Sequence, residues 1–97
     1  MVQPVYHKID QQRWQKFSPR EQLLHMASEL NRADHWQYSD EVKFKAALER
    51  LLELIDASID DRRWGDNRPM LWFLRDEIAK LYIGQKKTPI GYLYRAI

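Results

Sequence analysis

The sequence predicts an all-α protein, a small up-down bundle of three main helices with an irregular N-terminal segment and a short C-terminal tail. Apolar residues recur at steps of three and four over three long stretches, which is the spacing of one helix face. Capping or turn residues separate these stretches. Because the chain has only 97 residues, we expect one helical domain over residues 1–97.

Residues 1–17 lack the helical spacing, so we expect this segment to be irregular. The alternation of side-chain types at residues 5–9 indicates a short extended stretch. Trp14 and Phe17 are expected to attach the segment to the bundle, because aromatic side chains bury large areas.

The first main helix is predicted over residues 18–36. Ser18 stands at the N-cap, Pro19 at the first helical position and Glu21 at the third, which together form a capping box with an initial proline. The predicted apolar stripe of this helix consists of Leu23, Leu24, Ala27, Leu30 and Ala33.

The second main helix is predicted over residues 40–60, with Ser39 or Asp40 as its cap. The apolar face of this helix is wide, because Ala47 and Leu54 extend it. A helix with one apolar face needs partners that cover this face. The residues that define the face are Phe44, Leu48, Leu51, Leu52, Ile55 and Ile59.

The third main helix is predicted over residues 68–83. Asn67 and Gly65 mark the turn before it, and Gly84 is a natural C-terminal stop. Its predicted inner face consists of Leu71, Leu74, Ile78, Leu81 and Tyr82. Residues 84–97 are predicted to be a loop plus a short tail, whose apolar side chains either fold back on the bundle or dock on a second copy.

Composition narrows the class of protein. The chain contains no cysteine, which excludes disulfides, zinc–thiolate sites and cysteine nucleophiles. No stretch approaches the roughly 18 apolar residues of a membrane span, and the N-terminus lacks the apolar core of a signal peptide. We therefore expect a soluble cytoplasmic protein that uses no membrane, no cofactor and no metal.

Charge is unevenly distributed along a chain whose net charge is only +2. Residues 1–20 carry four bases and one acid, residues 21–61 four bases and ten acids, and residues 62–97 eight bases and three acids. Acidic helix faces can pair with basic neighbours within the bundle. Alternatively, the basic ends bind anions, and cations beside aromatic rings hold single-stranded nucleic acid. The residues that would do so are Arg13, Trp14, Lys16, Arg62, Arg63, Trp64, Lys86 and Lys87.

Arg20 and His25 stand in an Arg-x4-His pattern. The pattern resembles the nuclease signature of HEPN-type ribonucleases, which are also small helical bundles that act as dimers. The resemblance implies that His25 acts on the 2′-hydroxyl or the leaving group and that Arg20 steadies the phosphate. In this chain the pattern falls at the start of its helix, whereas that family carries it late in the bundle. The alternative is two unrelated surface side chains.

Two rows of potential metal ligands, mostly acidic, also fall at helical spacing. Di-metal bundles repeat Glu-x-x-His on two helices, and all-α nucleotide pyrophosphohydrolases combine Glu-x-x-Asp with Glu-x-x-Glu. Neither pattern is complete here, so both rows are interpreted as solvated or ion-paired side chains. The rows are Glu21, His25 and Glu29 on the first main helix and Glu53, Asp56 and Asp60 on the second.

The segments ASELxRA (27–33), ALERLLELID (47–56) with DRxW (61–64), and LRxEIAxLYxG (74–84) cover the three main helices. Together they resemble a group of small prokaryotic helical proteins known mainly as uncharacterised or structural-genomics targets. The resemblance spans about residues 23–84. It implies a bundle fold and offers no activity.

We predict a non-enzymatic helical bundle that associates with itself, as a dimer, or with a protein partner. The wide apolar face of the second helix and the apolar tail motivate this prediction. The enzyme alternative is a HEPN-like ribonuclease that uses Arg20 and His25, and the third is a single-stranded nucleic-acid binder. The predicted interface residues are Leu51, Leu54, Tyr92, Leu93, Tyr94 and Ile97.

Overall fold

The computed structural model describes residues 10–97, and every regular element within that range is helical. This confirms the all-α class, and the three long helices begin and end within one residue of their predicted bounds. The elements are α1 (Gln11–Gln15), α2 (Pro19–Trp36), α3 (Glu41–Ile59), the 3-10 helix η1 (Arg62–Asn67), α4 (Arg68–Tyr82) and the 3-10 helix η2 (Ile90–Ala96).

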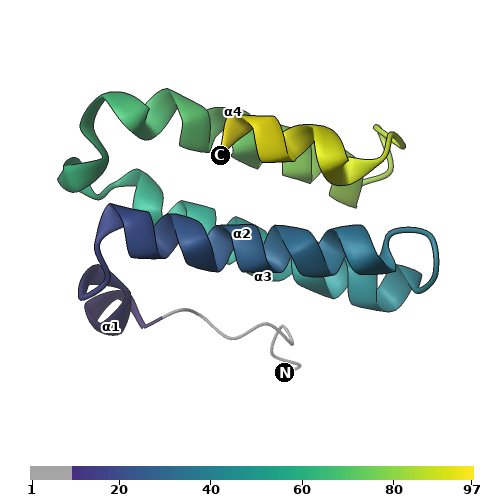
Figure 1. Cartoon of the computed structure of the whole chain (residues 1–97), viewed down its shortest axis with the longest axis horizontal. Coiled ribbons are helices and arrows are strands. Elements are labelled where there is room, and N and C mark those ends of the chain that lie inside the picture. Colours follow the sequence, from purple (N-terminus) through teal and green to yellow (C-terminus); the bar gives the residue numbers. More distant parts are fainter. Residues whose placement is uncertain (1–9) are drawn as a thin grey trace, which may run out of the picture.

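The long helices α2, α3 and α4 run alternately in opposite directions (Figure 1). α2 packs against α3 and α3 against α4, while η2 contacts both α2 and α4. The tail therefore occupies the position between α2 and α4 that a fourth helix would take. Residues 84–89 form a loop, as predicted, whereas residues 90–96 form η2, a helical turn that was not predicted and whose Ile90 and Leu93 are fully buried.

Local sequence explains where the helices begin. At α2, the Ser18 Oγ accepts from the Glu21 amide at 3.2 Å, and the Glu21 carboxylate accepts from the Ser18 amide at 3.0 Å. This is the predicted capping box. At α3, Asp40 is the cap, because its side chain accepts from the Lys43 amide. Gly84 follows α4 with a φ of 78°, a conformation that a glycine adopts without strain.

The core forms where α3 meets its neighbours, and it contains the predicted inner faces of α3 and α4, with Leu52 and Tyr82 only partly buried. The predicted stripe of α2 requires correction. Leu24 is 61% exposed, whereas Met26 and Gln22 are fully buried. Residues two apart in a helix point in nearly opposite directions, so the inward position of Met26 turns Leu24 toward solvent.

The prediction of an irregular segment over residues 1–17 is also wrong in part, because residues 11–15 form α1. Asp10 caps α1 by accepting from two backbone amides, and Trp14 is buried against the bundle, as expected. A five-residue helix is too short to show periodicity. The extended stretch predicted at residues 5–9 lies outside the described residues.

Candidate functional site

The structure does not bring Arg20 and His25 together. Five residues along α2 place the two side chains about 140° apart around the helix axis. The His25 ring packs against the rings of Phe17 and Trp14, with centroid distances of 4.7 Å and 5.6 Å. His25 lines a cleft between α1, α2 and α3, and Arg20 is not one of the residues that line it.

Four of the five carboxylates in the two rows, all except Asp60, have hydrogen-bond or ion-pair partners among residues 10–97. Asp56 accepts from the Arg75 Nε at 2.6 Å, and Glu53 accepts from Arg50 at 3.2 Å. Hydrogen bonds from the backbone and side chain of Ser18 hold the pKa of Glu21 below its usual range. Within residues 10–97, no group of three or more acidic, histidine or cysteine side chains is arranged to hold a metal ion.

The two tryptophans predicted to stack on nucleic-acid bases are both in the core. The indole N–H of Trp14 donates to the Ser58 hydroxyl at 2.9 Å, and that of Trp64 donates to the Gln22 side-chain oxygen at 2.7 Å. Gln22 in turn donates to the Trp14 carbonyl at 3.1 Å. These rings therefore present no face to a base, and their polar atoms complete a buried network.

Two of the cations predicted to bind nucleic acid are already bound to other groups of the chain. Arg63 donates to the carbonyl oxygens of Gln15 and Phe17 at 3.0 and 2.9 Å, which ties the end of α1 to η1. Its hydrogen bonds with Asp61 lower the pKa of that carboxyl and raise that of the guanidinium. Lys86 is bound to Glu77. Arg13, Lys16, Arg62 and Lys87 are exposed.

The predicted interface residues divide into two groups. Leu51, Leu54 and Leu93 are buried by their own chain, so they cannot contact a second copy unless the bundle opens. Tyr92 and Ile97 are half-buried in the docked tail. Tyr94 is exposed, and its hydroxyl lies within hydrogen-bond distance of Asn31 and Asp34 on α2.

Glu77, a buried carboxylate of α4, fixes the tail. It accepts from the Lys86 Nζ at 2.5 Å, the Tyr92 hydroxyl at 3.0 Å and the Lys80 Nζ at 3.3 Å. The hydrogen bond from Lys86, followed by those from Tyr92 and Lys80, lowers the pKa of Glu77 to about 2, although burial opposes this shift. The carboxylate is therefore ionised at neutral pH and holds three partners in place.

A second contact fixes the start of η2. The Gln37 side-chain nitrogen donates to the Thr88 carbonyl at 2.8 Å, and its side-chain oxygen accepts from the Ile90 amide at 2.8 Å. One amide side chain thus satisfies a donor and an acceptor of the tail backbone. The tail is held at two points, by Gln37 and by Glu77.

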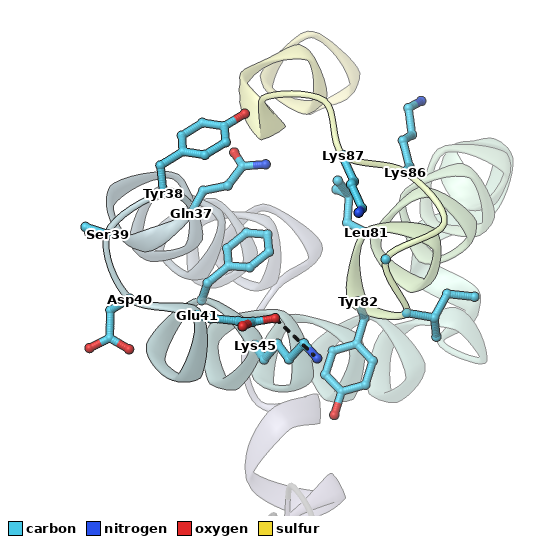
Figure 2. A pocket seen from close by; sticks show the side chains of 13 residues that line it. Gln37, Tyr38, Ser39, Asp40, Glu41, Lys45, Leu81, Tyr82, Lys86 and Lys87 are labelled. Carbon is cyan, nitrogen blue, oxygen red and sulfur yellow. Dashed lines mark ion pairs between the residues drawn. The ribbon is translucent and has the colours of Figure 1, made fainter.

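A cleft with a volume of about 720 Å³ lies at the end of the molecule where the α2–α3 corner faces the loop after α4. We call it the end cleft. Figure 2 shows the acidic corner, Asp40 and Glu41, on one side and the basic loop, Lys86 and Lys87, across from it. Its full lining is Gln37, Tyr38, Ser39, Asp40, Glu41, Phe44, Lys45, Leu81, Tyr82, Ile83, Gly84, Lys86 and Lys87.

Two of the large apolar side chains that line this cleft are unusually exposed. Tyr38 and Ile83 line it and are 74% and 70% exposed, and Val42, next to Glu41, is 79% exposed. The sequence analysis missed them, although Tyr38 is an aromatic residue in an otherwise polar connector and Ile83 follows the last turn of α4. An apolar residue placed where the chain turns is the signal that would have found them.

A second recess runs between α2 and α3, made of two clefts of about 490 and 330 Å³ that share Glu29, Arg32 and Arg50. We call it the α2–α3 furrow. His25, Arg13 and Phe17 line its α1 end, and Trp36 with Lys43 lines its other end.

Comparison with family models, with curated proteins and with solved structures finds no match to this chain. No helix in residues 10–97 combines the length and the apolar character needed to cross a bilayer. The surfaces described above are therefore the features of the chain that bear on its function.

Proposed function

We propose that this chain is a non-enzymatic helical-bundle protein that works by pairing with a second copy through the end cleft. The observation that carries the proposal is that Tyr38 and Ile83, each at least 70% exposed, line the same cleft. Exposed apolar side chains that gather beside a cleft and are flanked by charges are typical of interaction surfaces.

The charges beside this apolar surface favour a second copy as the partner. In a two-fold dimer, a residue that contacts another residue of the partner is matched by the reciprocal contact. The acidic corner contributes the exposed Glu41 and the basic loop the exposed Lys87 to the two sides of the same cleft, while Lys86 is held by Glu77 and Glu41 lies 3.7 Å from Lys45 of its own chain. The surface is therefore complementary to itself, because each copy's acidic corner can face the other's basic loop.

Light scattering across a range of protein concentrations tests the pairing, and we expect a dimer. Ile83→Glu is expected to weaken pairing by about tenfold or more, because it places a charge in the apolar centre of the interface. Trp72→Glu is the matched control, since Trp72 is also exposed but does not line the end cleft. A dimer that Trp72→Glu dissociates and Ile83→Glu does not would place the interface elsewhere.

A charge-reversal pair tests the two-fold arrangement directly. Glu41→Lys and Lys87→Glu are each expected to weaken the dimer, because each puts like charges across both halves of the interface. Mixing the two variants restores two attractive pairs, so a mixed dimer should form. A chain that stays monomeric at all concentrations, or variants that do not complement each other, would overturn the proposal.

A further inference from the structure

The structure separates the basic from the acidic side chains of residues 21–61, which a count of charges along the sequence does not show. Residues 21–61 carry ten acids and four bases. Three of those four bases, Arg32, Lys43 and Arg50, line the α2–α3 furrow, whereas Glu29 is the only one of the ten acids that does. The most acidic segment of the chain, residues 21–61, therefore contains a basic stripe.

The ion pairs along the furrow leave their cations open to solvent. Arg32 pairs with Glu29 at 3.2 Å, and the arginine side chain is 66% exposed while the glutamate is 14% exposed. Arg50 pairs with Glu53 at 3.2 Å, with exposures of 47% and 17%. In both pairs the carboxylate is covered and the guanidinium faces the furrow. Because an arginine has five N–H donors, each retains donors for a further anion.

At the α1 end of the furrow, too, the cation is open to solvent and the carboxylate accepts hydrogen bonds. Arg13 has no hydrogen-bond acceptor for its guanidinium among residues 10–97 and is exposed. The carboxylate of Asp10 also lines the cleft, but its Oδ1 accepts from the backbone amides of Gln12 and Arg13. Counted over the whole furrow, the lining has four cations, Arg13, Arg32, Lys43 and Arg50, and two carboxylates.

Aromatic rings stand at both ends of this basic stripe. The exposed His25 ring packs on Phe17 at one end, and the half-buried Trp36 ring lies under the Lys43 ammonium, 4.1 Å away, at the other. The eleven residues from His25 to Trp36 correspond to about 16 Å along α2. Small side chains, Ser28, Ala46 and Ala47, line the recess between these ends.

From this arrangement we infer that the α2–α3 furrow binds a short single strand of nucleic acid. A row of cations that follows a backbone, with rings on which bases stack, is the chemistry that binds single strands without sequence preference. Arg32 and Arg50 would contact phosphates, and His25 and Trp36 would contact bases. The inference does not depend on pairing at the end cleft, which involves other residues of the chain.

The test is fluorescence anisotropy with a labelled single-stranded oligonucleotide of about eight nucleotides. Four phosphate contacts predict that affinity falls about 50-fold between 50 and 200 mM salt. For Arg32→Gln combined with Arg50→Gln, two contacts remain and the fall should be about 7-fold. Both arginines lie in exposed i,i+3 pairs, so the variant is expected to keep its fold, which far-ultraviolet circular dichroism checks.

Arg75→Gln combined with Arg95→Gln is the matched control, because it removes the same charge from exposed arginines that do not line the furrow. We expect its affinity and salt dependence to equal those of the unchanged chain. His25→Ala should weaken binding without changing the salt dependence. No binding at 50 mM salt, an equal loss in the control, or displacement of the oligonucleotide by an equal charge of polyaspartate would each overturn the inference, the last in favour of an acidic protein.

Discussion

The two ends of the bundle hold their buried polar groups in different ways. At the end that carries α1 and η1 (Figure 1), the network of Trp14, Ser58, Gln22 and Trp64 is neutral. Along α4 and the tail, the cluster around Glu77 is ionic. The comparison shows that one small core can be closed by two kinds of contact, of which only the ionic one responds to pH and salt.

The neutral network also joins more of the chain. Trp14 comes from α1, Gln22 from α2, Ser58 from α3 and Trp64 from η1, so four elements meet in a few hydrogen bonds. Buried polar groups that are fully paired stabilise one arrangement over its alternatives, because a shifted arrangement leaves donors unsatisfied. We therefore expect the largest effects of substitution at this end.

Trp64→Ala is expected to have the largest effect, a loss of about 3–5 kcal/mol in the free energy of unfolding, because it opens a cavity and removes the donor to Gln22. Trp72→Ala is the matched control and should change stability by less than about 0.5 kcal/mol, since Trp72 is 54% exposed. Urea unfolding of both variants measures the contrast. Equal losses in the two would show that the network does not anchor this end.

The ionic cluster gives an intermediate effect that depends on pH. The pKa of Glu77 is lowered from the ordinary 4.5 to about 2, so its contribution to stability is complete above about pH 4.5 and is lost as the pH falls toward 2. Glu77→Gln should cost about 1–2 kcal/mol at pH 7. The difference between the two proteins should shrink between pH 4.5 and 2, as measured by urea midpoints. A difference that stays constant over this range would contradict the ionic role of Glu77.

The smallest effect is expected at the second point of attachment of the tail. Gln37→Ala removes two hydrogen bonds to the tail backbone at a partly exposed position, which should cost about 1 kcal/mol. Amide hydrogen exchange at Ile90 and Leu93 should accelerate more than exchange in α3, because the tail opens locally. Uniform acceleration throughout the chain would show that the tail does not open independently.

The helices were predictable because their signals are local. The capping box at Ser18, the cap at Asp40 and the apolar spacing of α3 each involve residues within a few positions of one another. Whether the tail folds back on its own bundle or docks on a second copy was not predictable from the sequence. It depends on Gln37, which is 51 positions from Thr88, and on Glu77, which is nine positions from Lys86, and neither residue carries a sign of its partners in the sequence.

The candidate binding surfaces, like the packing of the tail, could not be predicted from the sequence. Net charge along the sequence directed attention to the basic termini, yet two of the tryptophans there are buried and Arg63 and Lys86 are occupied. The basic stripe of the furrow comes from arginines on two helices within the acidic segment, residues 21–61. Only the packing of α2 on α3 brings Arg32 and Arg50 to one recess.

By itself the sequence determined the all-α class, the bounds of the three long helices and most of the core, because helix caps and apolar periodicity act over one or two turns. The tertiary structure alone decided where the tail packs, which tryptophans are buried and which charges face one another. Those outcomes depend on contacts between residues as many as 63 positions apart, whose strength is set by shared burial and by the partners that only folding brings together.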